Sequence, residues 1–239
     1  MTNPPALNAP PSGLTASTLQ VCRECGAGAP LDAHFCPQCT KILPLGRAAD
    51  YFRFLGLPRQ LRIDPAEIER RFRDLSRQFH PDYFYNAGAA ERRASLERSS
   101  YLNDAYRTLK QPMGRVEYLL KIEGLAAASP QDASKQVPPE LLQEVFALNE
   151  ELDEIRDLRA AGGSSTDIRE RLERARQPIE EKRAAHEAQL ASLSEQWDAL
   201  PDGAPDAERR KVLTALRDRT LERSYINNLL AGIERELSQ

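Results

Sequence analysis

A stripe of apolar residues at helical spacing stops just before a proline, and this pattern predicts the first arm of a helical hairpin. The stripe has steps of four, three and four residues, and its members are Ile68, Phe72, Leu75 and Phe79. A helix start stands before it, with Asp64 as the N-cap, Pro65 in the first turn and Glu67 placed to reach back to the cap. Because Pro81 cannot continue the helix, we expect the chain to turn there.

A second helical pattern comes after the turn and completes the predicted hairpin. It begins after a loop around Asn86-Ala87-Gly88 and continues to Leu109. His80-Pro81-Asp82 would then stand at the tip, where the bland interpretation is a proline turn whose Asp caps the next segment of the chain. We expect a small apolar seam to join the arms, formed by Phe52, Leu55, Ile68, Phe72, Leu75, Leu102, Ala105, Tyr106 and Leu109.

The first arm also carries a cluster of arginines. Most of them fall off the apolar stripe, and they are Arg70, Arg71, Arg73 and Arg77. Taken alone, such charges on one helix are usually a solvated surface. The whole chain has a formal net charge of −3, so its overall charge gives no reason to expect nucleic-acid binding.

Four cysteines form two Cys-x-x-Cys pairs, and no cysteine is left over. The pairs are Cys22 with Cys25 and Cys36 with Cys39. Two tight turns of this kind supply four soft thiolates, which favours one structural zinc ion per chain. Two disulfides, a redox dithiol and an iron–sulfur cluster are the alternatives. So short a segment buries little core, and metal binding would therefore supply its folding energy.

The C-terminal half shows three long helical patterns separated by short breaks. Gly124 ends a short helix before them, and residues 125–137 form an Ala/Ser/Pro/Gln linker. The patterns span about residues 138–159, 167–200 and 206–237. We expect Asp167 to cap the second pattern and Pro178 to kink or break it. Short breaks between long amphipathic helices favour an antiparallel three-helix bundle, with coiled-coil dimerisation as the alternative.

Two properties of the chain bear on its compartment. No apolar run approaches the roughly 20 residues that a membrane-spanning helix needs. Residues 1–12 lack the basic start and apolar core of a secretory signal, and the arginines of a mitochondrial presequence. We therefore expect a disordered tail over residues 1–18, no membrane partner and a cytoplasmic protein, in which disulfides are disfavoured.

Segments around the hairpin carry a resemblance to a known family. Asp50–Pro58 reads DYFRFLGLP, Tyr101–Lys110 reads YLNDAYRTLK and Arg115–Leu120 reads RVEYLL. With His-Pro-Asp among them, these segments resemble the HscB family, the J-domain co-chaperones of iron–sulfur cluster assembly. Phe35–Cys39, FCPQC, is similar to a string in the N-terminal tetracysteine module of human-type members. Tyr83 departs from the family, which usually has Lys directly after the tripeptide.

The resemblance implies a chaperone-binding surface. In J-domains the tripeptide and the basic helix face dock on the ATPase domain of a DnaK-type chaperone and bias it toward hydrolysis. The implied chaperone-binding residues of this chain are His80, Pro81, Asp82, Arg70, Arg71, Arg73 and Arg77. Guanidinium groups suit an acidic partner surface through bidentate hydrogen bonds and long-range steering. Because no residues form a catalytic set, we expect an activator and not an enzyme.

The same resemblance assigns the C-terminal half to binding an IscU-like iron–sulfur scaffold protein. Glu150–Ile155 matches the family's acidic run on the first bundle helix. Counting back from it gives the implied scaffold-binding residues Leu142, Gln143, Phe146, Ala147 and Glu150. Gln143 and Ala147 depart from the Met and Glu of bacterial relatives. On periodicity alone, a buried core position is the alternative for Leu142 and Phe146.

The expected fold is all-α, with a J-domain hairpin and a C-terminal antiparallel three-helix bundle behind a four-cysteine metal-binding module. The expected domains are a tail at 1–18, the module at 19–46, the J-domain at 47–124, a linker at 125–137 and the bundle at 138–239. The expected function is delivery of the scaffold protein to an HscA-like DnaK-type chaperone, with stimulation of its ATPase and promotion of cluster transfer. A general J-domain co-chaperone for unfolded clients and a zinc-knuckle adaptor protein are the alternatives.

Overall fold

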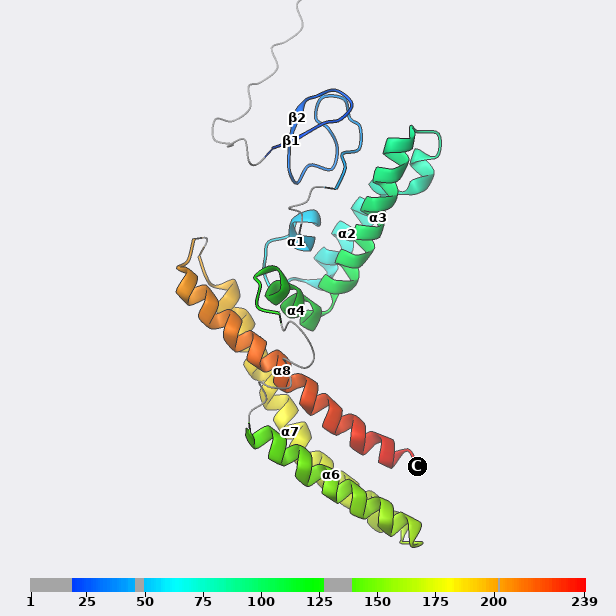
Figure 1. Ribbon diagram of the computed structural model, residues 1–239, viewed down its shortest axis with the longest axis vertical. Helices are drawn as coiled ribbons and strands as arrows, with labels where there is room; N and C mark the ends of the chain where they lie inside the picture. Colours follow the sequence, from blue (N-terminus) through cyan, green and yellow to red (C-terminus); the bar gives the residue numbers. More distant parts are fainter. Residues whose placement is uncertain (1–18, 46–49, 127–138, 202) are drawn as a thin grey trace, which may run out of the picture. The chain divides into compact units, whose positions relative to one another are not determined.

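The computed structural model describes residues 19–45, 50–126, 139–201 and 203–239. Its elements, in chain order (Figure 1), are β1 (Leu19–Val21), β2 (Gly28–Pro30), α1 (Tyr51–Phe54), α2 (Pro65–Phe79), the 3-10 helix η2 (Pro81–Phe84), α3 (Ala89–Lys110), α4 (Pro112–Ile122), α6 (Pro139–Ala160), α7 (Ser165–Asp198) and α8 (Asp206–Leu237). The all-α prediction is confirmed, since the sheet among the described residues has two strands of three residues. The tail predicted at 1–18 and most of the linker predicted at 125–137 lie outside the described residues.

Backbone contacts divide the chain into two compact units. The first comprises the described residues up to Pro58 together with Asp64–Lys110. The second comprises Arg59–Ile63 and the described part of Gln111–Gln239. The domain boundaries expected from the sequence stay a prediction.

In the first unit, α2 and α3 pack as an antiparallel hairpin around the predicted apolar seam. Ile68 and Leu102 are buried between the arms, and the rings of Phe72 and Tyr106 stack with their centroids 4.2 Å apart. Every other residue predicted for the seam is buried, namely Phe52, Leu55, Leu75, Ala105 and Leu109. The hairpin interpretation of the periodic stripe is therefore confirmed.

The start of α2 follows the predicted capping pattern in part. The Asp64 carboxylate accepts a hydrogen bond from the backbone N–H of Ala66 at 2.9 Å. Glu67 does not complete a capping box, and that expectation is wrong. Its carboxylate accepts hydrogen bonds from the guanidinium groups of Arg70 and Arg71 instead. Charge-assisted hydrogen bonds of this kind are stronger than one from a neutral backbone amide.

The cysteine module, residues 19–45, also belongs to the first unit. Strand β1 pairs antiparallel with β2, with Leu19 opposite Pro30, and a further bridge joins Phe35 to Ile42. The buried residues of the module are few, namely Cys22, Ala29, Cys36, Ile42 and Leu43. Two of these five residues are cysteines, so apolar burial alone is a weak source of folding energy here.

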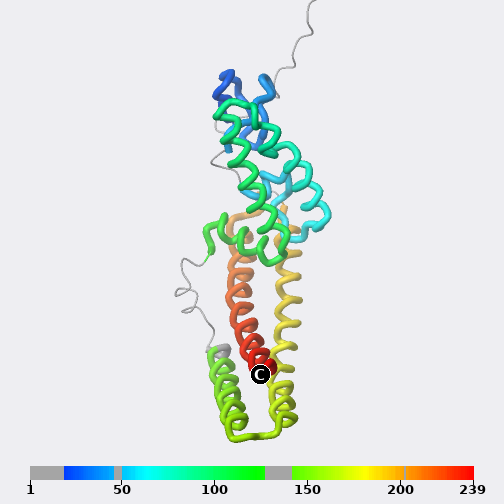
Figure 2. Tube along the Cα trace, turned by 90° about the vertical axis from the view of Figure 1, so that its right-hand side faces the viewer, coloured from blue at the N-terminus to red at the C-terminus, as the bar shows by residue number. Residues whose placement is uncertain are grey.

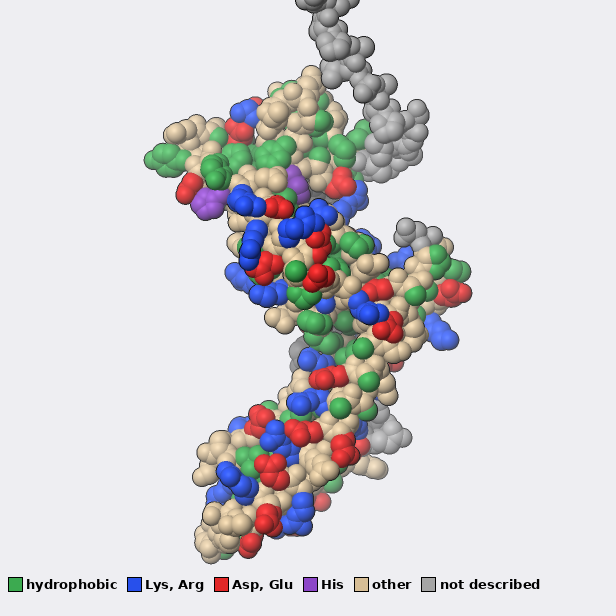
Figure 3. Space-filling model, turned by 180° about the vertical axis from the view of Figure 1, so that it is seen from behind, with side chains coloured by type: hydrophobic (Ala, Val, Ile, Leu, Met, Phe, Trp, Pro, Cys, Tyr) green, Lys and Arg blue, Asp and Glu red, His purple; other side chains and the backbone are tan. Residues whose placement is uncertain are grey.

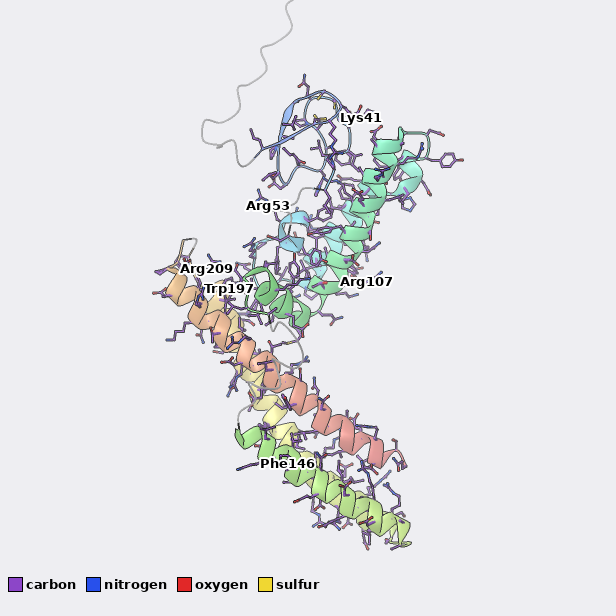
Figure 4. All side chains as sticks on the ribbon, viewed as in Figure 1. Lys41, Arg53, Arg107, Phe146, Trp197 and Arg209 are labelled. Carbon is purple, nitrogen blue, oxygen red and sulfur yellow. The ribbon has the colours of Figure 1, made fainter. Side chains whose placement is uncertain are left out.

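Arg98 of α3 joins the module to the hairpin. The side chain is 2% exposed, and it donates hydrogen bonds to the carbonyl oxygens of Leu43 at 2.7 Å and Pro44 at 3.1 Å. It also donates to Nδ1 of His34 at 2.7 Å. Burial lowers the pKa of Arg98 to about 10. Two ion pairs at the edges of the contact, Lys41–Glu91 and Arg53–Asp32 (Figure 4), are exposed enough to contribute little.

In the second unit, α6, α7 and α8 form the predicted antiparallel bundle, and α7 and α8 run side by side (Figure 2). The apolar cluster that joins all three helices is formed by Leu148, Leu152, Ile155, Ile168, Leu172, Leu229 and Ile233. Helices α7 and α8 are longer than α6 and extend beyond it. The end of α7 and the start of α8 pack against α4 in a second apolar cluster. Its members are Leu61, Val116, Leu119, Leu120, Leu190, Trp197, Val212, Leu213 and Leu216.

The boundaries of α7 differ from the sequence prediction at two places. Ser164, and not Asp167, is the N-cap, and its hydroxyl accepts a hydrogen bond from the Asp167 N–H at 3.5 Å. Pro178 lies inside α7 and does not end it. Ala175 and Ile179 on either side of the proline pack against the three-helix cluster, and this packing opposes the roughly 3 kcal/mol cost of an interior proline.

A buried carboxylate fastens α6 to the last turn of α8. The Glu236 side chain, 3% exposed, accepts hydrogen bonds at 2.7 Å from Arg156 and from Arg159. Arg159 also donates to the Glu236 carbonyl oxygen at 2.8 Å. Burial alone would raise the pKa of Glu236, but the two guanidinium groups outweigh it and hold this pKa below its usual value.

Replacing this carboxylate should weaken the bundle in a pH-dependent way. We expect Glu236→Gln to lower the free energy of unfolding by about 1–2 kcal/mol at neutral pH, because the charge-assisted hydrogen bonds are lost. Since the folded pKa of Glu236 is depressed, the advantage of the wild type is present above the ordinary Glu pKa of about 4.3 and disappears as the pH falls below it. Urea unfolding at several pH values measures this. Glu234→Gln, an exposed carboxylate on the same turn of α8, is the control.

Candidate functional site

The four cysteine sulfurs converge in the module. All four Sγ atoms lie within 4.8 Å of one another, with 3.6 Å between Cys22 and Cys39 and 3.6 Å between Cys25 and Cys36. The two knuckles have the same backbone design. Cys22 and Cys36 each accept a hydrogen bond from the residue four positions on, at Gly26 and Thr40. Both of these residues have positive φ, which Gly26 adopts without strain.

The donor set fits one tetrahedral metal ion. Zinc with Zn–S bonds of about 2.3 Å places its sulfur ligands roughly 3.8 Å apart, close to the observed spacing. All four cysteines are free thiols, so the structure contains no disulfide among them. Backbone N–H groups of Cys39 and Gln38 are among the groups that lower the pKa of Cys36 to about 6, whereas burial and the neighbouring thiols raise the pKa of Cys25 and of Cys39. Of these three thiols, Cys36 is therefore the one that most readily becomes the thiolate a metal requires. His34 takes no part in the sulfur cluster, because its Nδ1 is bonded to Arg98.

The His-Pro-Asp loop is exposed at the tip of the hairpin. His80 is the C-cap of α2 and the N-cap of η2, and its Nδ1 accepts a hydrogen bond from the Asp82 N–H at 3.3 Å. The Asp82 carboxylate lies 3.5 Å from the same nitrogen. Tyr83 and Tyr85 are exposed beside them. None of these groups is buried, and the loop contains no nucleophile paired with a base, so its surface suits recognition.

The arginine face of α2 is nearly neutral in sum. Each arginine forms an ion pair with an acid on its own helix, in the pairs Arg70–Glu67, Arg71–Glu67, Arg73–Glu69 and Arg77–Asp74. Figure 3 shows Lys and Arg side chains interleaved with Asp and Glu over one face of the molecule, with no single basic area. A partner that binds these arginines must replace the α2 carboxylates with carboxylates of its own. Because the charges on α2 nearly cancel, this helix exerts little long-range attraction on an acidic partner.

The candidate residues on α6 lie in the second unit, and all five are exposed. Leu142 is 41% exposed and Phe146, labelled in Figure 4, is 68% exposed. Leu148 and Leu152 are the buried side of the same helix. The core alternative for Leu142 and Phe146 is therefore wrong, because large apolar side chains here face solvent.

Arg98 is the residue that the sequence interpretation missed. It lies in a stripe of α3 with steps of three and four that consists of Ser95, Arg98, Leu102, Ala105 and Leu109, all buried. A charged residue in register with core positions signals a buried polar contact. The hydrogen-bond acceptors of Arg98, which lie in the cysteine module, could not be predicted from this pattern. His186, also buried, hydrogen-bonds through Nε2 to the Arg219 carbonyl and serves the bundle.

Comparison with known proteins accords with this arrangement. The DnaJ domain model matches residues 50–118. The crystal structure of human co-chaperone protein HscB superposes with a TM-score of 0.66 at 25% identity, covering 90% of this chain and 98% of that chain. Chaperone HscB from Vibrio cholerae gives a TM-score of 0.59 at 27% identity, covering 78% of this chain and 96% of that chain.

The hairpin with its exposed His-Pro-Asp loop and the DnaJ match define a J-domain protein. The likeness to the two HscB structures extends over both units, beyond the J-domain itself. The chain is therefore similar to the HscB co-chaperones over most of its length. Among the described residues, no helix combines the length and apolar character that a bilayer crossing requires.

Removal of the thiolates should remove the metal. We expect purified protein to contain one zinc ion per chain and Cys22→Ser/Cys25→Ser to contain none, because two ligands cannot retain what four hold. Elemental analysis measures the metal content of both proteins, and Ser100→Ala, an exposed hydroxyl outside the knuckles, is the control. Iron with a visible charge-transfer band would contradict the zinc assignment.

Proposed function

We propose that this chain is a co-chaperone of iron–sulfur cluster assembly. It binds an IscU-like scaffold protein on α6, docks through the His80 loop and α2 on the ATPase domain of an HscA-like DnaK-type chaperone, and stimulates ATP hydrolysis there. The chaperone then grips the scaffold, and cluster transfer to acceptor proteins follows. Similarity to the two HscB structures and the DnaJ match support this, and the identity of the scaffold partner is inferred from the resemblance to the HscB family.

The observation that carries the proposal is the exposure of two separate recognition surfaces. The loop from His80 to Tyr85 projects from the hairpin tip, and Phe146 projects from α6 in the other unit. Exposed groups of this kind contribute little to folding, whereas aromatic and apolar side chains are common anchors of interfaces. A protein with one surface for the chaperone and one for its client acts as an adaptor between them.

The α2 surface is suited to specific and not merely electrostatic docking. Arg73 and Arg77 are the most exposed of the four arginines, and each is held in place by a carboxylate three or four residues earlier. These pairs fix the guanidinium planes without burying them. An acidic surface on the chaperone would take over the arginines' hydrogen bonds, and bidentate geometry would then select its register.

The α6 surface combines apolar anchors with an acidic rim. Leu142 and Phe146 supply the apolar area, and Glu150 and Asp153 stand further along the same exposed side. An apolar patch rimmed by acids fits a scaffold surface that carries apolar residues beside basic ones. We also propose that the cysteine module binds one structural zinc ion.

Loss of the loop imidazole should abolish activation. We expect His80→Gln to lose stimulation of the cognate chaperone's ATPase while keeping its melting temperature, because the side chain is exposed. Steady-state ATPase assays measure this, with Asn86→Ala in the same loop as the control. Normal stimulation by the histidine variant would show that the loop is not the activating element.

Changing the charge balance of α2 should change the association rate in both directions. We expect Arg73→Ala to slow association with the chaperone and Glu69→Gln to speed it, because the second change frees Arg73 from its partner. Both effects should shrink as salt is raised. Stopped-flow binding at two ionic strengths measures this, and equal rates for both variants would contradict a role for the arginines in docking.

Truncation of the α6 anchors should separate binding from stability. We expect Leu142→Ala/Phe146→Ala to weaken scaffold binding by at least about 30-fold, equivalent to about 2 kcal/mol, with an unchanged melting temperature. The contrasting control is Leu148→Ala on the buried side, which should cost about 2–5 kcal/mol of stability. Calorimetric titration and thermal melting measure the two quantities. A folded double variant with normal affinity would place the scaffold on another face.

A further inference from the structure

We propose that the cysteine module is a brace for the His-Pro-Asp loop, so that metal binding at the cysteines sets how firmly the loop is held. The positioning residues are His34, Phe35 and Arg98, and all three act through Phe79. For its effect on the chaperone this inference rests on the proposed function, but the bracing itself does not.

Phe79 is the anchor of the loop, because it directly precedes His80. It is fully buried. Its carbonyl oxygen, at the end of α2, accepts hydrogen bonds from the hydroxyls of Ser95 at 2.6 Å and Ser99 at 2.9 Å on α3. These bonds fix the backbone at the point where the chain leaves the helix.

The module covers the ring of the same residue. The His34 ring meets the Phe79 ring edge-on with centroids 5.0 Å apart, and the Phe35 ring stacks on it at 5.9 Å. The guanidinium carbon of Arg98 lies 5.5 Å from the centre of the Phe79 ring. Phe79 is therefore buried partly by α3 and partly by a segment of chain next to the metal ligands.

The second knuckle fixes the position of these covering groups. His34 and Phe35 immediately precede Cys36, and the bridge from Phe35 to Ile42 closes the turn that contains both ligands. The Leu43 N–H donates to the His34 carbonyl oxygen at 2.9 Å across the same turn. The imidazole and the carbonyl that hold Arg98 thus stand at the base of the metal-binding loop.

Loss of the metal would remove this support, because the module has little else to fold around. Two of its five buried residues, Cys22 and Cys36, belong to the four-cysteine cluster that would hold the metal. Without the ordered turn, Arg98 would lose its acceptors at His34 and Leu43, and a buried cation without acceptors is costly. The remaining seam of the hairpin would keep the helices paired, so the loosening would be confined to the end of α2 and the loop.

Hydrogen exchange on the full-length chain tests the brace. The Tyr83 amide donates to the His80 carbonyl at 3.0 Å and reports on the loop, and the buried Leu190 in α7 serves as an internal control. Four samples are compared: zinc-loaded protein, protein stripped with a chelator, stripped protein with zinc restored, and Phe35→Ala. Val21→Ala, exposed in the same module, is the matched variant.

We expect the Tyr83 amide to exchange about tenfold faster in stripped protein and in Phe35→Ala, with Leu190 unchanged and protection regained when zinc returns. Phe35→Ala should retain its zinc and need about tenfold more protein for half-maximal chaperone stimulation, because an unordered loop must be ordered on binding. Equal Tyr83 exchange with and without zinc would overturn the proposal. If zinc-loaded wild type stimulates no DnaK-type chaperone, the proposed function fails, and the exchange rates still decide whether the module braces the loop.

Discussion

The first unit depends on a buried guanidinium that the structure satisfies without a carboxylate. The described partners of Arg98 are carbonyl oxygens, one imidazole nitrogen and two aromatic faces. Burial and the nearby Arg98 charge lower the pKa of His34 to about 4, so the imidazole is neutral and Nδ1 is free to accept. Such an arrangement is specific because each acceptor must be in place at once. A carboxylate would have tolerated more positions, whereas backbone carbonyls bind the cation only when the module has its native fold.

Local chemistry made much of this fold predictable. The steps between Ile68 and Phe79 determined α2, and the cysteine spacing determined the cluster of four sulfurs, because both patterns act over a few residues. Long-range packing explains the failures. Pro178 was expected to kink or break the helix, and α7 continues through it because the packing of Ile179 opposes the local cost of the proline. The exposure of Phe146 also could not be decided from periodicity, since a helix with apolar residues on two sides leaves open which side is buried.

The arginine face of α2 has ion pairs that the sequence interpretation did not include. The sequence indicated a basic surface, yet each arginine has an acidic neighbour one turn away on α2. Pairs of this sort reduce the field that a distant partner feels and keep the side chains in defined rotamers. In the proposed docking, selectivity among chaperones would rest on geometry at contact more than on attraction at a distance.

The short segment Arg59–Ile63 has a consequence for how such proteins can be rearranged in evolution. It interrupts the first unit but belongs to the second, where the Asp198 carboxylate accepts from the N–H groups of Leu61 at 2.7 Å and Arg62 at 2.9 Å. Trp197 donates to the Arg59 carbonyl, and Arg115 donates to that of Leu61. A gene fusion that transplanted residues up to Lys110 alone would carry this segment away from its partners. The J-domain of this chain is therefore not a freely exchangeable cassette, and its inheritance is tied to that of the helices behind it.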